Sequence, residues 1–296
     1  GEMVGVWCAQ TWAQLGGGPI SLVELGPGRG TLMADILRAT RHVAGFHDAL
    51  TLHMLEASPT LAHAQYQRLR DLHPRMEWID RLEELPPART LVIANEFFDA
   101  LPIRQYVMTS EGLRERRVGW DEEAQSLVFL MTDPGLALAK SGQKIAVGTV
   151  MEHCAAARAT VRQLAAHIRM HHGAALVIDY GYLGEAHHDT LQAVKRHSFH
   201  PVLKDPGEAD ITAHVDFSSL MEIAADAGHY VAPLLTQGEF LQRMGAPLRL
   251  ERLVKTATPE QKNHLIAGLD RLISPHAMGE LFKVFAFTSD RALELP

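Results

Sequence analysis

The sequence predicts an α/β fold in which a mostly parallel sheet is covered by helices on both faces. Apolar strand-like runs alternate with helical stretches along the chain, and a glycine-rich turn joins the first run to an amphipathic helix. This alternation is typical of parallel strands joined by crossover helices. The predicted strands are Ile20–Leu25, Leu50–Glu56, Met76–Ile79, Thr90–Ala94, Ala174–Asp179, His229–Leu235 and Leu281–Thr288.

Length and composition narrow the possible classes of protein. A chain of 296 residues with 47% hydrophobic content can form one large α/β domain, or a core domain with an insertion. Its net charge of -7 argues against a nucleic-acid partner, since such binding depends on Lys and Arg. No apolar run is long enough for a transmembrane segment. Cys8 and Cys154 lie far apart, which suggests neither a disulfide framework nor a zinc site.

The chain divides into three predicted parts: residues 1–102 begin the core, 103–150 form an inserted antiparallel meander, and 151–296 complete the core. The stretch between the fourth and fifth strands is much longer than one crossover helix requires. We expect Met151 to His172 to be helical and the irregular stretch 183–215 to form a lid-like loop over the site.

A helix from Thr258 to Ile273 carries the clearest boundary signals. Thr258, Pro259 and Gln261 have the pattern of an N-cap, first residue and capping-box partner. The sequence predicts that its apolar residues face inward: Leu265, Ile266, Leu269 and Leu272.

The segment after the first strand is a candidate ligand-binding loop. Gly26, Gly28 and Gly30 let the backbone turn tightly and approach a ligand, and the free N–H groups from Thr31 onward favour a carboxylate or phosphate. Tight strand-to-helix turns also use glycine for purely structural reasons.

Three acids near this loop suit an adenosine ligand. Glu56 ends the second strand, where an acid meets a ribose hydroxyl pair, although a dinucleotide fits the same features. Glu24 lies within the first strand and needs a partner if buried, which is either a ligand or the amides of the loop. Asp80 follows the third strand and either accepts from an adenine amino group or caps a turn.

The most specific segment lies at the end of the fourth strand, where open α/β sheets place their ligands. Its two acids can grip a guanidinium, and its rings can line a slot for a planar or cationic group. Alternatively, the rings belong to the core and Asp99 caps a helix. The candidates are Asn95 for the ligand, Glu96 and Asp99 for catalysis, and Phe97, Phe98, Leu101 and Pro102 for the substrate.

Further candidates lie in the second half of the chain. Asp179 and Tyr180 end the fifth strand and face the substrate, unless the aspartate only forms a turn. His214 is a candidate for proton removal, although a neutral histidine bonded to a loop carbonyl is the alternative. Asp216 fits a helix N-cap. The histidine pairs, His171-His172 and His187-His188, lack a metal-ligand spacing, so we expect no metal.

Four motifs together resemble the MidA-like family of respiratory complex I assembly methyltransferases. They are Glu24-Leu25-Gly26-Pro27-Gly28-Arg29-Gly30-Thr31, Asn95-Glu96-Phe97-Phe98-Asp99-Ala100-Leu101-Pro102, Ile178-Asp179-Tyr180-Gly181 and Asp210-Ile211-Thr212-Ala213-His214-Val215-Asp216-Phe217. Their order along the chain makes them far more specific than the glycine loop alone.

The resemblance implies a class I methyltransferase fold of the Rossmann-like type, with a mixed seven-stranded sheet whose last strand is antiparallel. It implies S-adenosylmethionine as cofactor, with Glu24 holding its ammonium end indirectly. The implied activity is arginine methylation of a protein, with a complex I subunit of the 49 kDa type as target. The location is the bacterial cytoplasm or, in a eukaryote, the mitochondrial matrix. The family has a stretch before Gly1, so we expect a preceding segment.

Two other functions remain open from the residues alone. A nicotinamide-dependent oxidoreductase can use the same first βαβ unit, but no second catalytic signature supports it. A non-catalytic assembly factor can keep the fold and bind a partner without chemistry.

Overall fold

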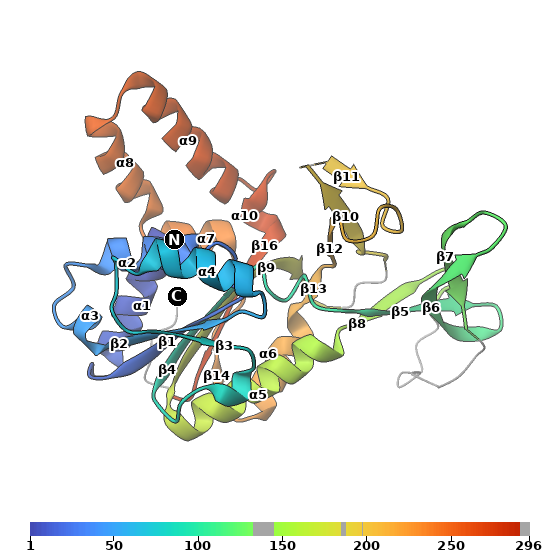
Figure 1. The fold of residues 1–296 in the computed structure, drawn as a ribbon, viewed down its shortest axis with the longest axis horizontal. Coiled ribbons are helices and arrows are strands. Elements are labelled where there is room, and N and C mark those ends of the chain that lie inside the picture. The colour runs from blue at the N-terminus through green and yellow to red at the C-terminus, as the bar shows by residue number, and fades with distance from the viewer. Residues whose placement is uncertain (133–144, 185–187, 197, 291–296) are drawn as a thin grey trace.

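The computed structural model describes residues 1–132, 145–184, 188–196 and 198–290 (Figure 1). Residues 133–144 of the predicted insertion, residues 185–187 and 197 of the predicted lid, and with them His187, lie outside the described residues. Among the described residues, no helix combines the length and apolar character needed to cross a membrane.

The central sheet has the strand order β14-β16-β9-β4-β1-β2-β3, and the short strands β13 and β15 pair with β9 and β16. β16 runs antiparallel to both β9 and β14, while the pairs from β9 to β3 are parallel. The predicted mixed sheet with an antiparallel last strand is therefore confirmed. Its strands are β1 (Ile20–Leu25), β2 (Leu50–Leu55), β3 (Met76–Ile79), β4 (Thr90–Asn95), β9 (Gly173–Tyr182), β13 (Val215–Asp216), β14 (Tyr230–Val231), β15 (Leu235–Thr236) and β16 (Phe282–Thr288).

Helices cover both faces of this sheet, as the ribbon shows (Figure 1). α1, α2 and α7 pack on one face and α5 and α6 on the other. The helices are α1 (Glu2–Gln14), α2 (Thr31–Thr40), α3 (Phe46–Ala49), α4 (Pro59–Leu69), α5 (Ala155–His171), α6 (Phe217–Asp226), α7 (Gln237–Arg243), α8 (Ala246–Thr256), α9 (Pro259–Ile273) and α10 (Met278–Leu281), with a 3-10 turn, η1 (Leu82–Glu84).

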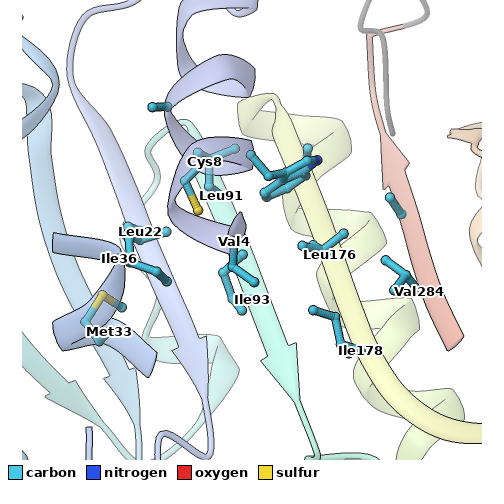
Figure 2. Packing of buried hydrophobic residues seen from close by; sticks show 14 of the residues in the cluster. Val4, Cys8, Leu22, Met33, Ile36, Leu91, Ile93, Leu176, Ile178 and Val284 are labelled. Atoms are coloured by element: carbon cyan, nitrogen blue, oxygen red, sulfur yellow. The ribbon is translucent and has the colours of Figure 1, made fainter. Parts of the chain in front are cut away.

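Side chains of the buried strands point alternately to the two faces of the sheet, so the protein has one hydrophobic core on each face. In β1, Leu22 points into the core beneath α1 and α2, whereas Val23 points into the core beneath α5 and α6. Figure 2 shows Leu22 packed with Val4 and Ile36 from the covering helices. Because both faces are covered, all six residues of β1 are buried, including the polar ones.

Two predictions near the end of the chain need correction. The run His229–Leu235 forms two short strands, β14 and β15, rather than one. Pro233 lies between them and has no N–H to donate to a ladder. The short helix α10 ends at Leu281, so the last strand begins one residue later than predicted, at Phe282.

A second, antiparallel sheet projects from the core between β4 and α5 (Figure 1). Its order is β7-β6-β5-β8, and its strands are β5 (Arg104–Thr109), β6 (Gly112–Asp121), β7 (Ser126–Met131) and β8 (Val150–His153). The helix predicted from Met151 starts later. Met151 pairs with Tyr106 as part of β8, and Cys154 caps α5 by accepting from the Ala157 N–H.

The stretch 183–215 is not an irregular loop. Its described residues contain a three-stranded antiparallel sheet in the order β11-β10-β12. The strands are β10 (Gln192–Lys195), β11 (Ser198–His200) and β12 (Asp210–Thr212). They are too short to show a clear two-residue period in the sequence, which explains why the pattern was missed.

The capping box of α9 is confirmed, because Thr258 and Gln261 accept from each other's backbone N–H groups. The predicted inward apolar face is wrong in part. Ile266 is 52% exposed and Leu272 38% exposed. α9 packs on α7, α8 and α10 and not on the central sheet, so only a narrow stripe is covered.

Candidate functional site

The glycine loop lies at the carboxyl edge of β1 and has the geometry expected of a ligand cradle. Gly26, Gly28 and Gly30 all have positive φ, at 59°, 53° and 70°, which other residues rarely adopt. A Cβ placed on Gly26 would lie 3.0 Å from Cδ2 of Phe97. Gly30 is the N-cap of α2 without a side-chain cap, and Thr31 follows it as the exposed first residue of the helix. The N-terminus of α2 is therefore available to an anionic group.

Glu24 lies beneath this loop as a carboxylate with a missing partner. Its side chain is 3% exposed, and the Met33 backbone N–H donates to it. Its Oε2 is buried and has no hydrogen-bond partner. Burial raises the pKa of Glu24 to about 8, against the lowering effect of the Met33 amide. A buried oxygen without a partner is costly, so the site fits a ligand group that bonds to it.

Glu56, at the end of β2, is tied to the glycine loop by a residue that sequence reasoning missed. The Gln65 Nε2 donates to Glu56 Oε2 at 3.0 Å and to the Gly28 carbonyl at 2.8 Å. Gln65 also accepts from Trp78 Nε1 at 2.7 Å and is fully buried. The signal was present, because Leu61, Gln65 and Leu69 are spaced by four residues along α4, which places a polar residue within an apolar stripe. Gln65 thus fixes the acid relative to the loop.

Asp80 lies after β3 on the surface. Its backbone N–H donates to Glu84 Oε2 at 3.1 Å. The structure shows no contact that separates an adenine-binding role from a turn role, so the ligand role of Asp80 stays a prediction.

The acidic corner after β4 is held in a strained backbone conformation. Glu96 has φ 50°, unusual for a residue with a Cβ, and its N–H donates to the Ile178 carbonyl at 2.9 Å. The Asn95 Nδ2 lies 3.4 Å from Glu96 Oε1. Partial desolvation, and then the charge of Asp99, raises the pKa of Glu96. The two predicted acids therefore act on one another.

Asp99 and Tyr180 meet at this corner. The Tyr180 hydroxyl donates to Asp99 Oδ2 at 2.6 Å, while Asp99 Oδ1 is buried and has no partner. Asp99 is 6% exposed, and desolvation raises the pKa of its carboxyl. A second acid with a free buried oxygen thus lies beside Glu96.

Asp179 does not face a substrate, contrary to the sequence prediction. It is fully buried, and its carboxylate accepts from the backbone N–H groups of Phe98, Asp99 and Tyr180 at 3.0, 3.2 and 2.9 Å. Desolvation, and then the charge of Asp99, raises its pKa. Asp179 agrees better with the alternative prediction of a turn-forming aspartate, because its carboxylate joins the acidic corner to β9.

The predicted substrate residues of the corner divide into two groups. Phe97 is half-buried and its ring packs on Gly26, whereas Phe98 is 3% exposed and lies in the core beneath α5 and α6. The two rings meet edge to face with centroids 5.3 Å apart. A substrate role for Phe98 is therefore corrected to core packing. Leu101 packs against the same core, and Pro102 is exposed, with its carbonyl accepting from Cys154 Sγ.

His214 is not brought into contact with the two candidate catalytic acids. Its ring meets Tyr180 edge to face at 5.5 Å, and it lines a small separate cavity of about 50 Å³ with Glu152 and Asp216. Desolvation, and then His188, lowers the pKa of His214. Asp216 is confirmed as the N-cap of α6, since it accepts from the Ser219 N–H.

A cavity of about 740 Å³ opens over the acidic corner, within the size range of ligand sites. It lies between the carboxyl edge of β4 and β9, the start of β16 and the small sheet β11-β10-β12. Its walls are Glu96, Asp99, Ala100, Tyr180, Gln192, Val194, Phe199, Ala209, Asp210, Ile211, Thr212, Leu281 and Phe282.

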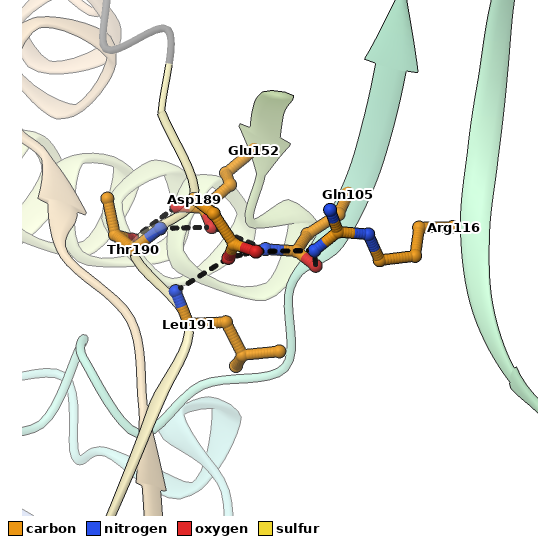
Figure 3. Close-up of polar contacts among 6 residues, drawn as sticks. All are labelled: Gln105, Arg116, Glu152, Asp189, Thr190 and Leu191. Atoms are coloured by element: carbon orange, nitrogen blue, oxygen red, sulfur yellow. Dashed lines mark hydrogen bonds and ion pairs between the residues drawn. The ribbon is translucent and has the colours of Figure 1, made fainter. Parts of the chain in front are cut away.

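A polar cluster fixes the chain just before β10 (Figure 3). The Gln105 Nε2 donates to both Glu152 Oε1 and Asp189 Oδ1 at 2.7 Å, and Arg116 pairs with Asp189 at 2.5 Å. Thr190 donates to Glu152 from its N–H at 3.0 Å. The cluster joins the projecting sheet to the segment that enters the small sheet.

Over the described ranges, no three His, Cys, Asp or Glu side chains are grouped as metal ligands. Cys8 and Cys154 are free thiols.

Comparison with known proteins identifies the family. Residues 3–234 match the family model of the S-adenosyl-L-methionine-dependent methyltransferases. A relative from Danio rerio, the mitochondrial protein arginine methyltransferase NDUFAF7, is 36% identical over 97% of this chain and 73% of its own length. The Homo sapiens protein of the same name is 32% identical over 99% of this chain and 72% of its own. The chain belongs to this methyltransferase family.

A solved structure supports the fold and the cofactor. A COG1565 superfamily member from Burkholderia thailandensis bound to S-adenosyl-homocysteine aligns with a TM-score of 0.83 and 30% identity, over 99% of this chain and 76% of that one. The protein described here is an S-adenosylmethionine-dependent methyltransferase of the class I fold. The unpartnered Glu24 oxygen and the open glycine cradle fit this cofactor.

Gly26→Ala tests the cradle. We expect affinity for S-adenosylmethionine to fall tenfold or more, about 1.4 kcal/mol, because the added Cβ strains a positive φ and displaces Phe97. Calorimetry measures the affinity. The matched control is Gly16→Ala, which has φ 85° and an open environment at the other edge of the sheet. Equal affinity in both variants would contradict the assignment.

Asp179→Ala tests the anchor of the corner. Loss of a buried acceptor for three backbone N–H groups should lower the free energy of unfolding by about 3 kcal/mol. Urea denaturation measures this change. Asp226→Ala, at an exposed aspartate of α6, should change the stability by less than about 0.5 kcal/mol. A loss at Asp179 no larger than the control's would show that the corner does not depend on this carboxylate.

Proposed function

We propose that this enzyme methylates a guanidinium nitrogen of an arginine in a protein substrate. The observation that carries the proposal is the acidic corner: Glu96 and Asp99 share one cavity, and Phe97 between them packs on the donor loop. Relatives that align over nearly the whole chain are named protein arginine methyltransferases. Carboxylates next to the donor loop support the proposal, because they can orient a guanidinium.

The charges of the corner suit a guanidinium. Two carboxylates can bind its N–H groups in a fork and fix the plane of the group, which leaves one nitrogen directed away from them. The raised pKa values of both acids mean that a cationic side chain gains by pairing with them, since pairing favours the ionised forms. When bound, S-adenosylmethionine supplies an electrophilic methyl group, and the residues of the corner contribute mainly by positioning.

The strained backbone at Glu96 supports a role in binding rather than in folding. A positive φ costs stability and persists only where the surrounding structure holds it. Here Asp179 holds Phe98 and Asp99 from one side, and the Ile178 carbonyl holds the Glu96 N–H. The side chain of Glu96 is consequently directed into the cavity, which it lines.

We propose further that the substrate is a subunit of respiratory complex I of the 49 kDa type, which the motif resemblance implies. The named relatives are mitochondrial, so the proposed location is the mitochondrial matrix in a eukaryote. In a bacterium the proposed location is the cytoplasm. The alternative function is a non-catalytic assembly factor. The variants Glu96→Gln and Asp99→Asn test this alternative as well as the methyl transfer.

Glu96→Gln and Asp99→Asn remove the charges of the corner while keeping the shapes of the side chains. We expect transfer of labelled methyl groups to a complex I 49 kDa-type subunit to fall about tenfold to a hundredfold for each, because a charge-assisted bond is lost. Affinity for S-adenosylmethionine should stay within twofold by calorimetry. If the wild-type enzyme transfers no labelled methyl group to the subunit at saturating donor, the proposal is refuted. Complex I assembly that survives both substitutions would favour a binding role over chemistry.

The acid limb of the pH profile is a separate test. Glu96 must be ionised to bind a guanidinium, and its pKa is raised, so kcat/KM should rise with pH through a value above the usual 4.3 or so of a glutamate. Below that pH the proton competes with the substrate. Steady-state kinetics across pH give the limb, and Glu96→Gln should flatten or shift it. If the wild-type enzyme and Glu96→Gln show the same acid limb, the limb belongs to another titrating group.

A further inference from the structure

We propose that one face of the small sheet β11-β10-β12 is a substrate-selecting wall, on which Phe199 and Asp210 bind the arginine side chain that Glu96 and Asp99 hold at its end. This inference deepens the proposed function and rests on it. It adds a second binding surface, from a segment of the chain far from the donor loop.

The strand register shows which side chains share the cavity face. In antiparallel strands, residues directly opposite one another lie on the same face. Val194 pairs with Phe199 on one side and with Asp210 on the other, and Gln192 pairs with Thr212. All five of these residues line the cavity over the acidic corner. The small sheet therefore presents a complete face to the site and not only its edge.

Charge is separated between the two faces of this sheet. Lys195 and His200 belong to the opposite face, where both pair with Asp205, and Lys195 also pairs with Glu208. Among the described residues, those lining the cavity include three carboxylates, from Glu96, Asp99 and Asp210, and no Lys or Arg. Arg271 of α9 is the cation whose charge acts on Glu96. The cavity thus complements a cationic side chain.

The apolar part of the wall suits the stem of that side chain. Phe199 is 83% exposed, although it is a large aromatic residue, and Val194 lies opposite it in the register. Across the cavity are Leu281, which is 44% exposed, and Phe282. A guanidinium can stack on an aromatic face while its methylene stem covers apolar surface. Phe199 and Asp210 thus provide two kinds of contact that one arginine uses together.

Both ends of the wall are attached to the rest of the site. Thr190 and Leu191 enter β10 directly from the polar cluster with Glu152 and Asp189 (Figure 3). After β12, the Ala213 N–H donates to the Asp99 carbonyl at 3.0 Å. The wall is therefore positioned against the acidic corner by fixed polar contacts, which is what a specificity surface requires.

The test uses butylguanidinium, which has the stem and charge of an arginine side chain, and butylurea, which has nearly the same planar shape without the charge. Both are titrated at millimolar concentrations into the enzyme with S-adenosyl-homocysteine present, and binding is followed by NMR. We expect the wild-type enzyme to bind butylguanidinium and to bind butylurea at least fivefold more weakly. Equal binding of the two, or no binding of butylguanidinium, would overturn the wall as a cation site.

Variants then assign the contacts. Phe199→Ala and Asp210→Asn should each weaken butylguanidinium binding about three- to tenfold, since exposed cation–π and ion-pair contacts have that strength. The matched controls are Leu248→Ala on α8, 64% exposed, and Asp226→Asn on α6, neither of which lines the cavity. Affinity for S-adenosyl-homocysteine should be unchanged in all four variants. Wall variants that bind butylguanidinium like their controls would overturn the proposal.

Transfer kinetics separate this inference from the proposed function. With the 49 kDa-type subunit, the wall variants should raise KM about three- to tenfold with little change in kcat, because they act on substrate binding. If the wild-type enzyme transfers methyl groups and the wall variants match the controls, the wall is wrong and the proposed function stands. If the wild-type enzyme transfers none while butylguanidinium binding depends on Phe199 and Asp210, the proposed substrate is wrong and the wall stands.

Discussion

The buried carboxylate of Asp179 accepts hydrogen bonds from three backbone N–H groups, and the geometry of the acidic corner depends on that interaction. β4 and β9 are neighbours in the sheet, so an acid at the end of β9 reaches the chain that leaves β4. By binding Phe98 and Asp99 at their N–H groups, Asp179 turns this chain sharply at the carboxyl edge. The turn places Phe97 on the donor loop, sends Phe98 into the core and leaves Glu96 at the cavity.

Fixing the corner in this way concentrates negative charge in a poorly solvated place. Glu96, Asp99 and Asp179 all have raised pKa values, and Asp99 keeps a buried oxygen without a partner. Such an arrangement lowers stability, because each ionised carboxylate is partly stripped of water and repels the others. Glu24 repeats the pattern at the donor loop, with its own unpartnered oxygen. A cationic group beside either set of carboxyls would therefore improve the electrostatics of the protein.

The sequence predicted the central sheet well because its signals are local. β1 and β3 match the predicted bounds, and the glycine loop and the end of β4 carry motifs that occupy consecutive residues. The predictions failed where a structure depends on contacts between distant segments. Asp179 was assigned to the substrate because nothing near it in the sequence reveals its three partners, which lie at the end of another strand or in its own turn. Phe97 and Phe98 look alike in the sequence, and only the turn at Glu96 directs one ring to the loop and the other to the core.

The small sheet β11-β10-β12 is another part of the structure that local sequence signals did not predict, and its strand pairing matters for the proposed function. Its strands have three or four residues, and the pairing of Val194 with Phe199 and Asp210 sets which side chains face the acids. A shift of the register by one residue would reverse that face and turn Lys195 and His200 toward the cavity in place of Phe199 and Asp210. In that alternative Lys195 would repel a cationic substrate, whereas in the observed register Lys195 pairs with Asp205 and Glu208 on the far side, with His200 also beside Asp205. The proposed donor site therefore uses continuous motifs of the sheet edge, while the proposed preference for a cation depends on strand register in a segment that follows β9.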